Sequence, residues 1–380
     1  PSIVEPRAER AAHAVENAPH TEMLDVEIAP IDPLFNYLLS SSGPVDVDEL
    51  LLDSPGLKAL KAAGVKLTVP LVSQGELIGL LNLGPRLSEQ AYSTDDRRLL
   101  NDLATQAAPA VRVAQLVRQQ QAEALERERV EQEMRVASII QQTLLPQELP
   151  QLDGWGVAAY WQPARAVGGD FYDFIPFPDG RMGIIIGDVT DKGVPAAMVM
   201  ATTRSVLRAV TERLVSPGEV LEQVNNLLCP DIPQNMFVTC LYAVLDPSSG
   251  ELEFANAGHC LPVLIEGAGT RELRATGMPL GLIPDMDYEE KQTTLLPGES
   301  VLFYSDGLIE AHNSEGEMFG TARLRELSNG QTGGADLIEF LLAELTAFAG
   351  SGWEQEDDAT FVTLKRSAGD PQEIHAPGPS

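Results

Sequence analysis

Residues 182–197 read MGIIIGDVTDKGVPAA, and this stretch decides how the C-terminal part of the chain folds. Its apolar beginning, Met182 to Gly187, predicts a short strand. Pro195 follows at a position typical of the first turn of a helix, which we expect to run to about Leu214. Asp188 therefore lies where a strand ends in a glycine-containing turn.

Short strands of the same kind are predicted on both sides of this stretch. Two further helices are expected, one from Ser216-Pro217 to near Cys229 and one from Ala335 to Phe348. Strands outnumber helices and are joined largely by hairpins, so we expect antiparallel sheets packed against helices, an α+β fold. The other predicted strands are Gly156–Gln162, Phe171–Phe177, Phe237–Leu245, Glu251–Ala255, Pro262–Ile265, Ser300–Tyr304 and Thr360–Leu364.

Several acidic residues share the setting of Asp188, at a predicted strand end beside a glycine or a turn. A carboxylate there is a natural ligand for Mg²⁺ or Mn²⁺. Each one alone is also a common turn signal. Together they would place bare carboxylates at the edge of an apolar core unless a cation compensated them. The set is Asp170, Asp188, Asp306 and the pair Asp357-Asp358.

These residues belong to a series of motifs that occur in a fixed order. The motifs are ASIIQQTLLP at 137–146, VGGDFYD at 167–173, GDVTDKGVPAA at 187–197, NAGH at 256–259, YSDGLIEA at 304–311 and DDAT at 357–360. Residues 130–365 thereby resemble the SpoIIE-like branch of the PPM metal-dependent serine/threonine phosphatases, which includes the RsbU stress-response phosphatases. The resemblance implies an αββα sandwich with a two-metal site at one end of the paired sheets.

The same resemblance implies which residues carry the chemistry. Two divalent cations, Mn²⁺ or Mg²⁺, would be held by Asp170, Asp188, the backbone carbonyl of Val189, Asp306 and Asp357. Asp170, Asp188 and Asp306 would act in catalysis through a metal-activated water. Asp358 is the less expected ligand, because the first acid of the family's Asp-Asp motif binds metal.

Eukaryotic relatives of this family also carry a phosphate-binding Arg and a His general acid. Arg165 could reach a phosphate, but a surface salt bridge is the favoured interpretation. His259 could be an acid, but a structural role in its turn is favoured over catalysis.

The N-terminal region predicts a smaller α+β domain. Strands at Val65–Val72 and Leu77–Leu83 flank a turn, and Ser93 to Asp96 offers a helix N-cap. Upstream, Pro30, Pro33 and Pro44 interrupt the chain, so order there is expected to be weakly specified. Residues of about 30 to 115 resemble the second half of a GAF domain, without a cysteine; a small domain used only for dimerisation is the alternative.

Residues 112–144 contain no Gly or Pro and predict a long exposed helix. A weak parallel coiled coil is the favoured interpretation, and a single amphipathic helix lying along its own domain is the alternative. Its seam would comprise Val113, Leu116, Val130, Met134, Ala137, Gln141 and Leu144, interrupted by Gln120, Glu123 and Arg127.

We therefore expect five parts in the chain. They are a poorly ordered segment at 1–29, a GAF-like sensor domain at 30–111, a helical coiled-coil linker at 112–146, the phosphatase domain at 147–366 and a disordered tail at 367–380.

Composition limits the possible partners and compartments. The 380 residues include 26 Lys and Arg against 56 Asp and Glu, and the net charge of −30 disfavours binding to nucleic acid or anionic lipid. No apolar segment approaches the roughly 20 residues of a membrane span. The three cysteines, Cys229, Cys240 and Cys260, form no C-x-x-C pair, which predicts a reducing compartment, the cytoplasm.

The resulting hypothesis is a phosphatase acting on phosphoserine or phosphothreonine. By family resemblance its substrate would be a phosphorylated anti-anti-sigma (STAS) protein. The coiled-coil pattern of the linker helix predicts a homodimer, and the GAF-like domain is expected to control the activity. Residues 168–171, Gly-Gly-Asp-Phe, also have some likeness to a diguanylate cyclase hairpin, but the second acid is missing. The alternative is a protein without enzymatic activity, a catalytically silent dimeric scaffold. The presence of all four aspartates expected to bind metal argues against it.

Overall fold

The computed structural model describes residues 28–88, 90–267, 269–350 and 355–368. The segments predicted to lack order, 1–29 and 367–380, lie almost entirely outside these residues. The chain divides into two compact units, Pro1–Glu128 and Arg129–Ser380. Among the helices in the described residues, none combines the length and the hydropathy that crossing a membrane requires.

The N-terminal unit contains a three-stranded antiparallel sheet in the order β1-β2-β3. Its elements are α1 Pro33–Ser40, β1 Val45–Asp46, α2 Pro55–Ala62, β2 Leu67–Ser73 and β3 Glu76–Leu83. The predicted hairpin is present as β2 and β3, with Gln74 and Gly75 at positive φ in its turn. Leu34, Leu38 and Leu60 are among the fully buried side chains of its core.

The expectation of weak order around the early prolines is wrong for this unit. Pro33 occupies the first turn of α1, where Asp32 caps the helix by accepting a hydrogen bond of 2.8 Å from the Leu34 amide. Ser54 and Pro55 start α2 in the same way. A proline in the first turn removes an amide that has no helical partner, so these prolines begin helices instead of preventing them.

A single helix, α3 Thr94–Leu144, covers both the last helix of the N-terminal domain and the predicted linker. Pro109 lies inside this helix. The helix therefore continues without a break through residue 112, where the sequence placed the start of a separate linker.

The C-terminal unit contains two five-stranded antiparallel sheets, ordered β10-β9-β12-β13-β4 and β11-β8-β7-β6-β5. Its strands are β4 Trp155–Gln162, β5 Phe171–Pro176, β6 Met182–Val189, β7 Val238–Asp246, β8 Glu251–Ala257, β9 Val263–Glu266, β10 Gly269–Glu272, β11 Glu290–Thr294, β12 Ser300–Tyr304 and β13 Ala359–Arg366. Its further helices are α4 Val194–Thr211, α5 Pro217–Leu228, α6 Asp306–Ile309, α7 Gly320–Ser328 and α8 Ala335–Ala349.

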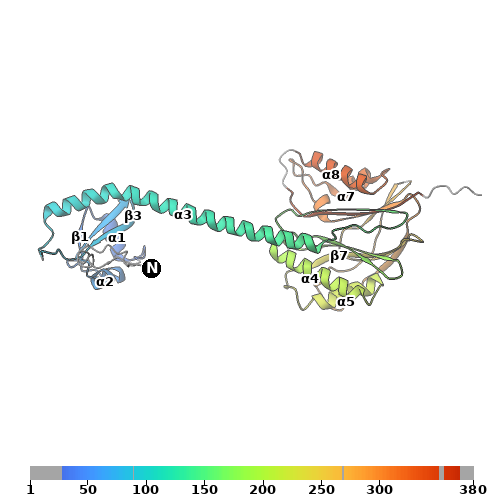
Figure 1. The fold of residues 1–380 in the computed structure, drawn as a ribbon, viewed down its shortest axis with the longest axis horizontal. Helices are drawn as coiled ribbons and strands as arrows, with labels where there is room; N and C mark the ends of the chain where they lie inside the picture. Colours follow the sequence, from blue (N-terminus) through green and yellow to red (C-terminus); the bar gives the residue numbers. More distant parts are fainter. Residues whose placement is uncertain (1–27, 89, 268, 351–354, 369–380) are drawn as a thin grey trace, which may run out of the picture. The chain divides into compact units, whose positions relative to one another are not determined.

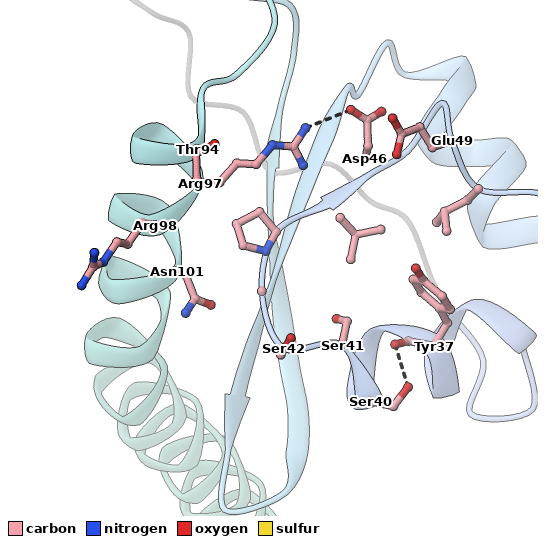
Figure 2. Close-up of a pocket in the computed structure, with 14 residues that line it drawn as sticks. Tyr37, Ser40, Ser41, Ser42, Asp46, Glu49, Thr94, Arg97, Arg98 and Asn101 are labelled. Carbon is pink, nitrogen blue, oxygen red and sulfur yellow. Dashed lines mark hydrogen bonds and ion pairs between the residues drawn. The ribbon is translucent and has the colours of Figure 1, made fainter.

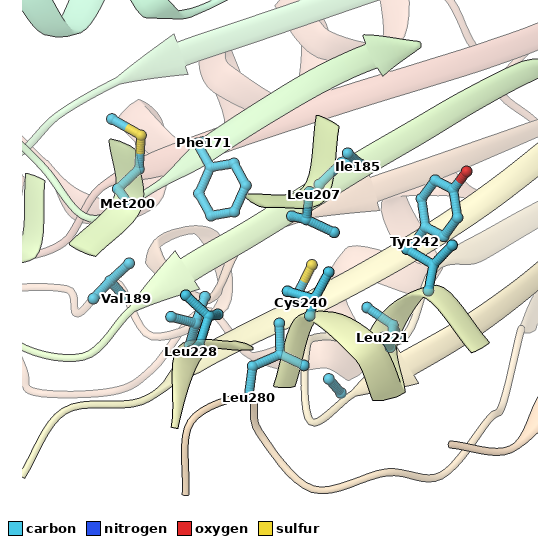
Figure 3. Packing of buried hydrophobic residues seen from close by; sticks show 14 of the residues in the cluster. Phe171, Ile185, Val189, Met200, Leu207, Leu221, Leu228, Cys240, Tyr242 and Leu280 are labelled. Carbon is cyan, nitrogen blue, oxygen red and sulfur yellow. The ribbon is translucent and has the colours of Figure 1, made fainter. Parts of the chain in front are cut away.

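Within this unit the two sheets pack face to face, with α4 and α5 on one outer side and α7 and α8 on the other (Figure 1). The alternating side chains of strand β6 explain this layered packing. Ile184 and Ile186 point into the core between the sheets, while Ile185 points into the core beneath α4 and α5. Figure 3 shows Ile185 and Phe171 among the side chains of that second core. The predicted αββα sandwich is confirmed.

Four elements of this unit were not predicted: β10, β11, α6 and α7. The two strands lie at sheet edges and carry polar sequences, GTRE and EKQTT. An edge strand with little apolar surface to bury lacks the alternation by which strands are found in a sequence.

Candidate metal centre

Strand ends from both sheets bring the predicted acidic residues to one edge of the sandwich. In one sheet Phe171 of β5 pairs with Gly187 of β6, so Asp170 and Asp188 stand side by side. In the other sheet β12 and β13 end their pairing at Tyr304 and Phe361, which places Asp306 beside the Asp357-Asp358 pair.

The two sheets are joined at this edge by the carboxylate of Asp358. Its Oδ2 accepts hydrogen bonds from the amides of Gly169, at 2.6 Å, and Asp170, at 3.2 Å, and its Oδ1 accepts one from Ala164. The approach leaves no space for side chains: a Cβ on Gly168 would lie 2.0 Å from Asp358 Oδ2. Asp358 therefore organises the loop that carries Asp170.

Asp170 is fully buried at the centre of this edge. Its Oδ2 accepts a hydrogen bond of 2.6 Å from the Thr360 hydroxyl, while its Oδ1 has no partner among the described residues. Burial, and then the charges of Asp188 and Asp358, raise the pKa of Asp170 well above its usual range. A buried carboxylate oxygen with a free lone pair is suited to a hard cation.

The neighbouring carboxylates repel one another in the same way. Burial and then the charges of Asp306 and Asp357 raise the pKa of Asp188 to about 7. Burial, followed by Asp357 and Glu310, raises the pKa of Asp306 to about 6. Bound cations would relieve this repulsion, so the donor set fits divalent metal.

The side chains of the described residues do not form a complete set of metal ligands. No group of three or more His, Cys, Asp or Glu within that part of the chain is arranged to hold a metal ion. Protein groups engage two of the expected ligands: Thr360 bonds to Asp170, and Lys192 Nζ lies 3.1 Å from Oδ2 of Asp357. The backbone oxygen of Val189 lies close to the Asp170 loop, 2.6 Å from where a Cβ on Gly169 would stand.

His259 is held inside its turn. Its backbone N–H donates to Asn256 Oδ1, its carbonyl accepts from Asn256 Nδ2, and its Nδ1 lies 2.9 Å from the Thr239 hydroxyl. Burial lowers the pKa of its imidazole to about 4. Thr239 pairs with Asp188 in the sheet, so His259 supports the strand next to the site. Arg165 is exposed on the loop before Asp170.

A second buried aspartate, Asp173, lies only three residues beyond Asp170, and no sequence signal distinguishes it as a site residue. Asp173 on β5 is fully buried and pairs with two arginines of α4. Arg208 makes two hydrogen bonds to its carboxylate, of 2.6 and 2.8 Å, and Arg204 lies 3.0 Å away. This ion pair joins the strand after Asp170 to the helix after Asp188.

Gln141 has a role different from the predicted one. The seam places it toward a partner helix, but the side chain is buried against the phosphatase unit itself. Its Nε2 donates to the carbonyl of Gly168 at 2.6 Å, and its Oε1 accepts from the Gly168 amide at 3.0 Å. The C-terminal end of α3 is thus bound directly to the loop that carries Asp170.

The N-terminal unit has a polar pocket of about 800 Å³ between the end of α1, β1 and the start of α3 (Figure 2). Ser41, Glu49 and Asn101 are among its lining residues. Arg97 lies against it but is paired with Asp46 at 3.2 Å, so its charge is already compensated.

Two family models match the chain. The one described as Stage II sporulation protein E (SpoIIE) covers residues 178–367, half of the chain, and the one described as GAF domain covers residues 3–112. Among curated proteins, protein IcfG from Synechocystis sp. is 32% identical over 258 residues, which are 60% of this chain and 40% of IcfG. Phosphoserine phosphatase RsbU from Bacillus subtilis is 29% identical over 189 residues, 49% of this chain and 56% of RsbU. The chain spans about half the length of these relatives.

Solved structures share the fold of the C-terminal unit. The SiaA-PP2C domain of Pseudomonas aeruginosa superposes with a TM-score of 0.57 at 23% identity, over 64% of this chain and 98% of that domain. The RsbU and RsbW domains of Rv1364c from Mycobacterium tuberculosis give a TM-score of 0.50 at 28% identity, over 60% of this chain and 64% of theirs. The chain therefore belongs to the SpoIIE family and joins an N-terminal GAF domain to a phosphatase domain of the PP2C fold.

Proposed function

We propose that this protein is a metal-dependent phosphatase of phosphoserine and phosphothreonine in proteins. The observation that supports it most strongly is the meeting of Asp170 and Asp188 from one sheet with Asp306 from the other. They lie at one edge of the sandwich, where Asp170 is fully buried, Asp188 and Asp306 are partly buried, and the carboxylates repel one another. The names of two relatives, phosphoserine phosphatases RsbU and RsbP of Bacillus subtilis, support the same reaction.

In this proposal two divalent cations, Mn²⁺ or Mg²⁺, bind between the sheets. The ligands would be Asp170, Asp188, the Val189 carbonyl, Asp306 and Asp357. When bound, the cations would supply an activated water and charge stabilisation at phosphorus. Water adds its oxygen to phosphorus and loses one proton, the bond from phosphorus to the serine oxygen breaks, and the serine oxygen gains a proton, so that the water's proton is accounted for. The products are a serine hydroxyl and inorganic phosphate.

The chain's own residues prepare the site for this step. Asp358 fixes the loop before β5 by accepting three backbone hydrogen bonds, from Ala164, Gly169 and Asp170, and Thr360 orients the carboxylate of Asp170. Such outer contacts hold ligands in place before the substrate arrives.

For the substrate, we infer a phosphorylated anti-anti-sigma (STAS) protein. The similarity to RsbU supports this, as does the strongly negative charge, which disfavours nucleic acid as a partner. We further propose that the GAF domain regulates the reaction and that the chain dimerises through α3, whose Val113, Leu125 and Val130 are exposed apolar residues.

The test is release of inorganic phosphate from a phosphoserine peptide by the full chain. We expect turnover with Mn²⁺, loss of turnover on chelation and recovery when Mn²⁺ returns. A silent scaffold would release no phosphate under any of these conditions, and that result would overturn the proposal.

A further inference from the structure

Lys192 lies in the turn between β6 and α4, four residues after Asp188. Its Nζ is 3.1 Å from Oδ2 of Asp357 and also donates to the backbone carbonyl of Glu356. The loop before β13 and the loop after β6 are therefore bridged by one ammonium group.

The backbone around Lys192 is set by an unusual turn. Asp191 has φ of 77° and Gly193 has φ of 81°, so left-handed residues stand on both sides. The Asp191 carboxylate accepts a hydrogen bond of 2.8 Å from the Lys192 amide. A non-glycine residue in this region is strained, and such strain persists where the surrounding structure holds it at functional sites.

Lys192 is the one cation that forms an ion pair with a proposed metal ligand in the described part of the chain. Arg204 and Arg208 are both committed to Asp173. A phosphate ester approaching this edge meets several carboxylates on a chain of net charge −30. Besides any metal, a positively charged side chain within reach would attract it.

We propose that Lys192 binds a non-bridging oxygen of the substrate phosphate, and that its contact with Asp357 is the position it holds while no phosphate is present. This inference rests on the proposed phosphatase function. The side chain is 32% exposed, so the ammonium has room to move. Lysine binds phosphate as a flexible point charge, and its charge-assisted hydrogen bonds are among the strong ones.

The experiment compares the full-length wild type with Lys192→Gln, Lys192→Arg and the control Lys291→Gln. Lys291 is also a half-exposed lysine paired with a carboxylate, Glu289 at 2.6 Å, but it lies on the edge strand β11. Calorimetry measures the affinity for inorganic phosphate in Mg²⁺ and, separately, for Mn²⁺ alone. Turnover of a phosphoserine peptide gives KM and kcat.

We expect Lys192→Gln to weaken phosphate binding and raise KM by about tenfold or more, with a smaller effect on kcat. Lys192→Arg should recover part of the loss, and Lys291→Gln should match wild type. Mn²⁺ affinity in Lys192→Gln should stay equal or rise, because Asp357 loses its competing ammonium.

Unchanged phosphate affinity in Lys192→Gln, or a wild type that binds no phosphate, would overturn the role of Lys192. Loss of Mn²⁺ binding in Lys192→Gln would also overturn it, since the residue would then only position the ligand. Failure of the proposed function looks different. In that case wild type binds phosphate in a Lys192-dependent way but turns over no peptide.

Discussion

Asp170 and Asp173 lie three residues apart at the start of β5, and both are fully buried. The carboxylate of Asp173 is compensated by two arginines from α4. In the described residues, one oxygen of the Asp170 carboxylate accepts a hydrogen bond from the Thr360 hydroxyl, the other oxygen has no partner, and other carboxylates lie around it. The charge of Asp173 is balanced by side chains of the protein, whereas the charge of Asp170 would be balanced by a cation from solution. In our proposal this difference separates an aspartate that stabilises the fold, Asp173, from one that binds metal for catalysis, Asp170.

The largest expected effect is on turnover, when a carboxylate of the uncompensated group around Asp170 is removed. Asp188→Asn, like Asp306→Asn, should lower turnover by more than the roughly 10- to 100-fold that loss of an outer-shell partner costs. Because the pKa of Asp188 is raised to about 7 by burial and its acidic neighbours, removing its charge relieves repulsion. In chelated protein the variant should unfold at the same or a higher urea concentration. Wild-type turnover by Asp188→Asn at saturating Mn²⁺ would contradict the ligand assignment.

Substitution of the compensated aspartate, Asp173, should have the opposite effect: it should lower stability and leave turnover largely unchanged. Asp173→Asn leaves Arg204, only 13% exposed, without its counter-charge, and should lower the free energy of unfolding by about 3 kcal/mol. Turnover per folded molecule should stay within a few-fold of wild type. Urea unfolding and phosphate release, measured together, check both statements. A stable but inactive Asp173→Asn would remove the distinction between the two aspartates.

A smaller effect is expected where α3 binds the Asp170 loop. Gln141→Leu leaves the buried N–H and carbonyl of Gly168 unpaired, which costs about 1–3 kcal/mol per group. Turnover should fall about tenfold as Asp170 loses its fixed position. Gln142→Leu, at the exposed neighbour, is the matched control. Equal turnover by the two variants would show that the contact only holds the helix.

The smallest expected effect comes from the polar part of the predicted seam. Replacing Gln120, Glu123 and Arg127 with Leu should strengthen a dimer through α3 and change basal turnover several-fold in one direction. Light scattering measures the dimer, and phosphate release measures the change. Equal turnover rates in wild type and a more tightly dimerised variant would show that the helix only connects the two domains. A wild type that is monomeric at micromolar concentration would contradict the coiled-coil prediction.

The sequence predicts well what is local in the chain. Strand-end aspartates with adjacent glycines are visible as short motifs, and through the family resemblance that these motifs carry they imply the αββα sandwich and its acidic edge. Pro33 does not disrupt order as predicted, because the Asp32 cap makes it the start of a helix. Polar edge strands such as β11 carry no apolar alternation and were missed.

Contacts between distant residues were not visible in the sequence. Gln141 and Gly168 are 27 residues apart, and Lys192 meets a carbonyl 164 residues away. In the sequence, Gln141 fits the heptad pattern of a coiled-coil seam. Only the structure shows that its side chain bonds to the backbone of Gly168. The arginines of Asp173 likewise look like the exposed face of a helix.

We claim that the edge formed by Asp170, Asp188, Asp306 and Asp357 binds two divalent cations, and calorimetric titration of chelated protein with Mn²⁺ measures the number of ions bound. Wild type should bind two ions per chain, and Asp306→Asn should lose or strongly weaken one of them, while Asp173→Asn still binds two. No binding by wild type, or the same two-site isotherm from Asp306→Asn, would contradict the claim.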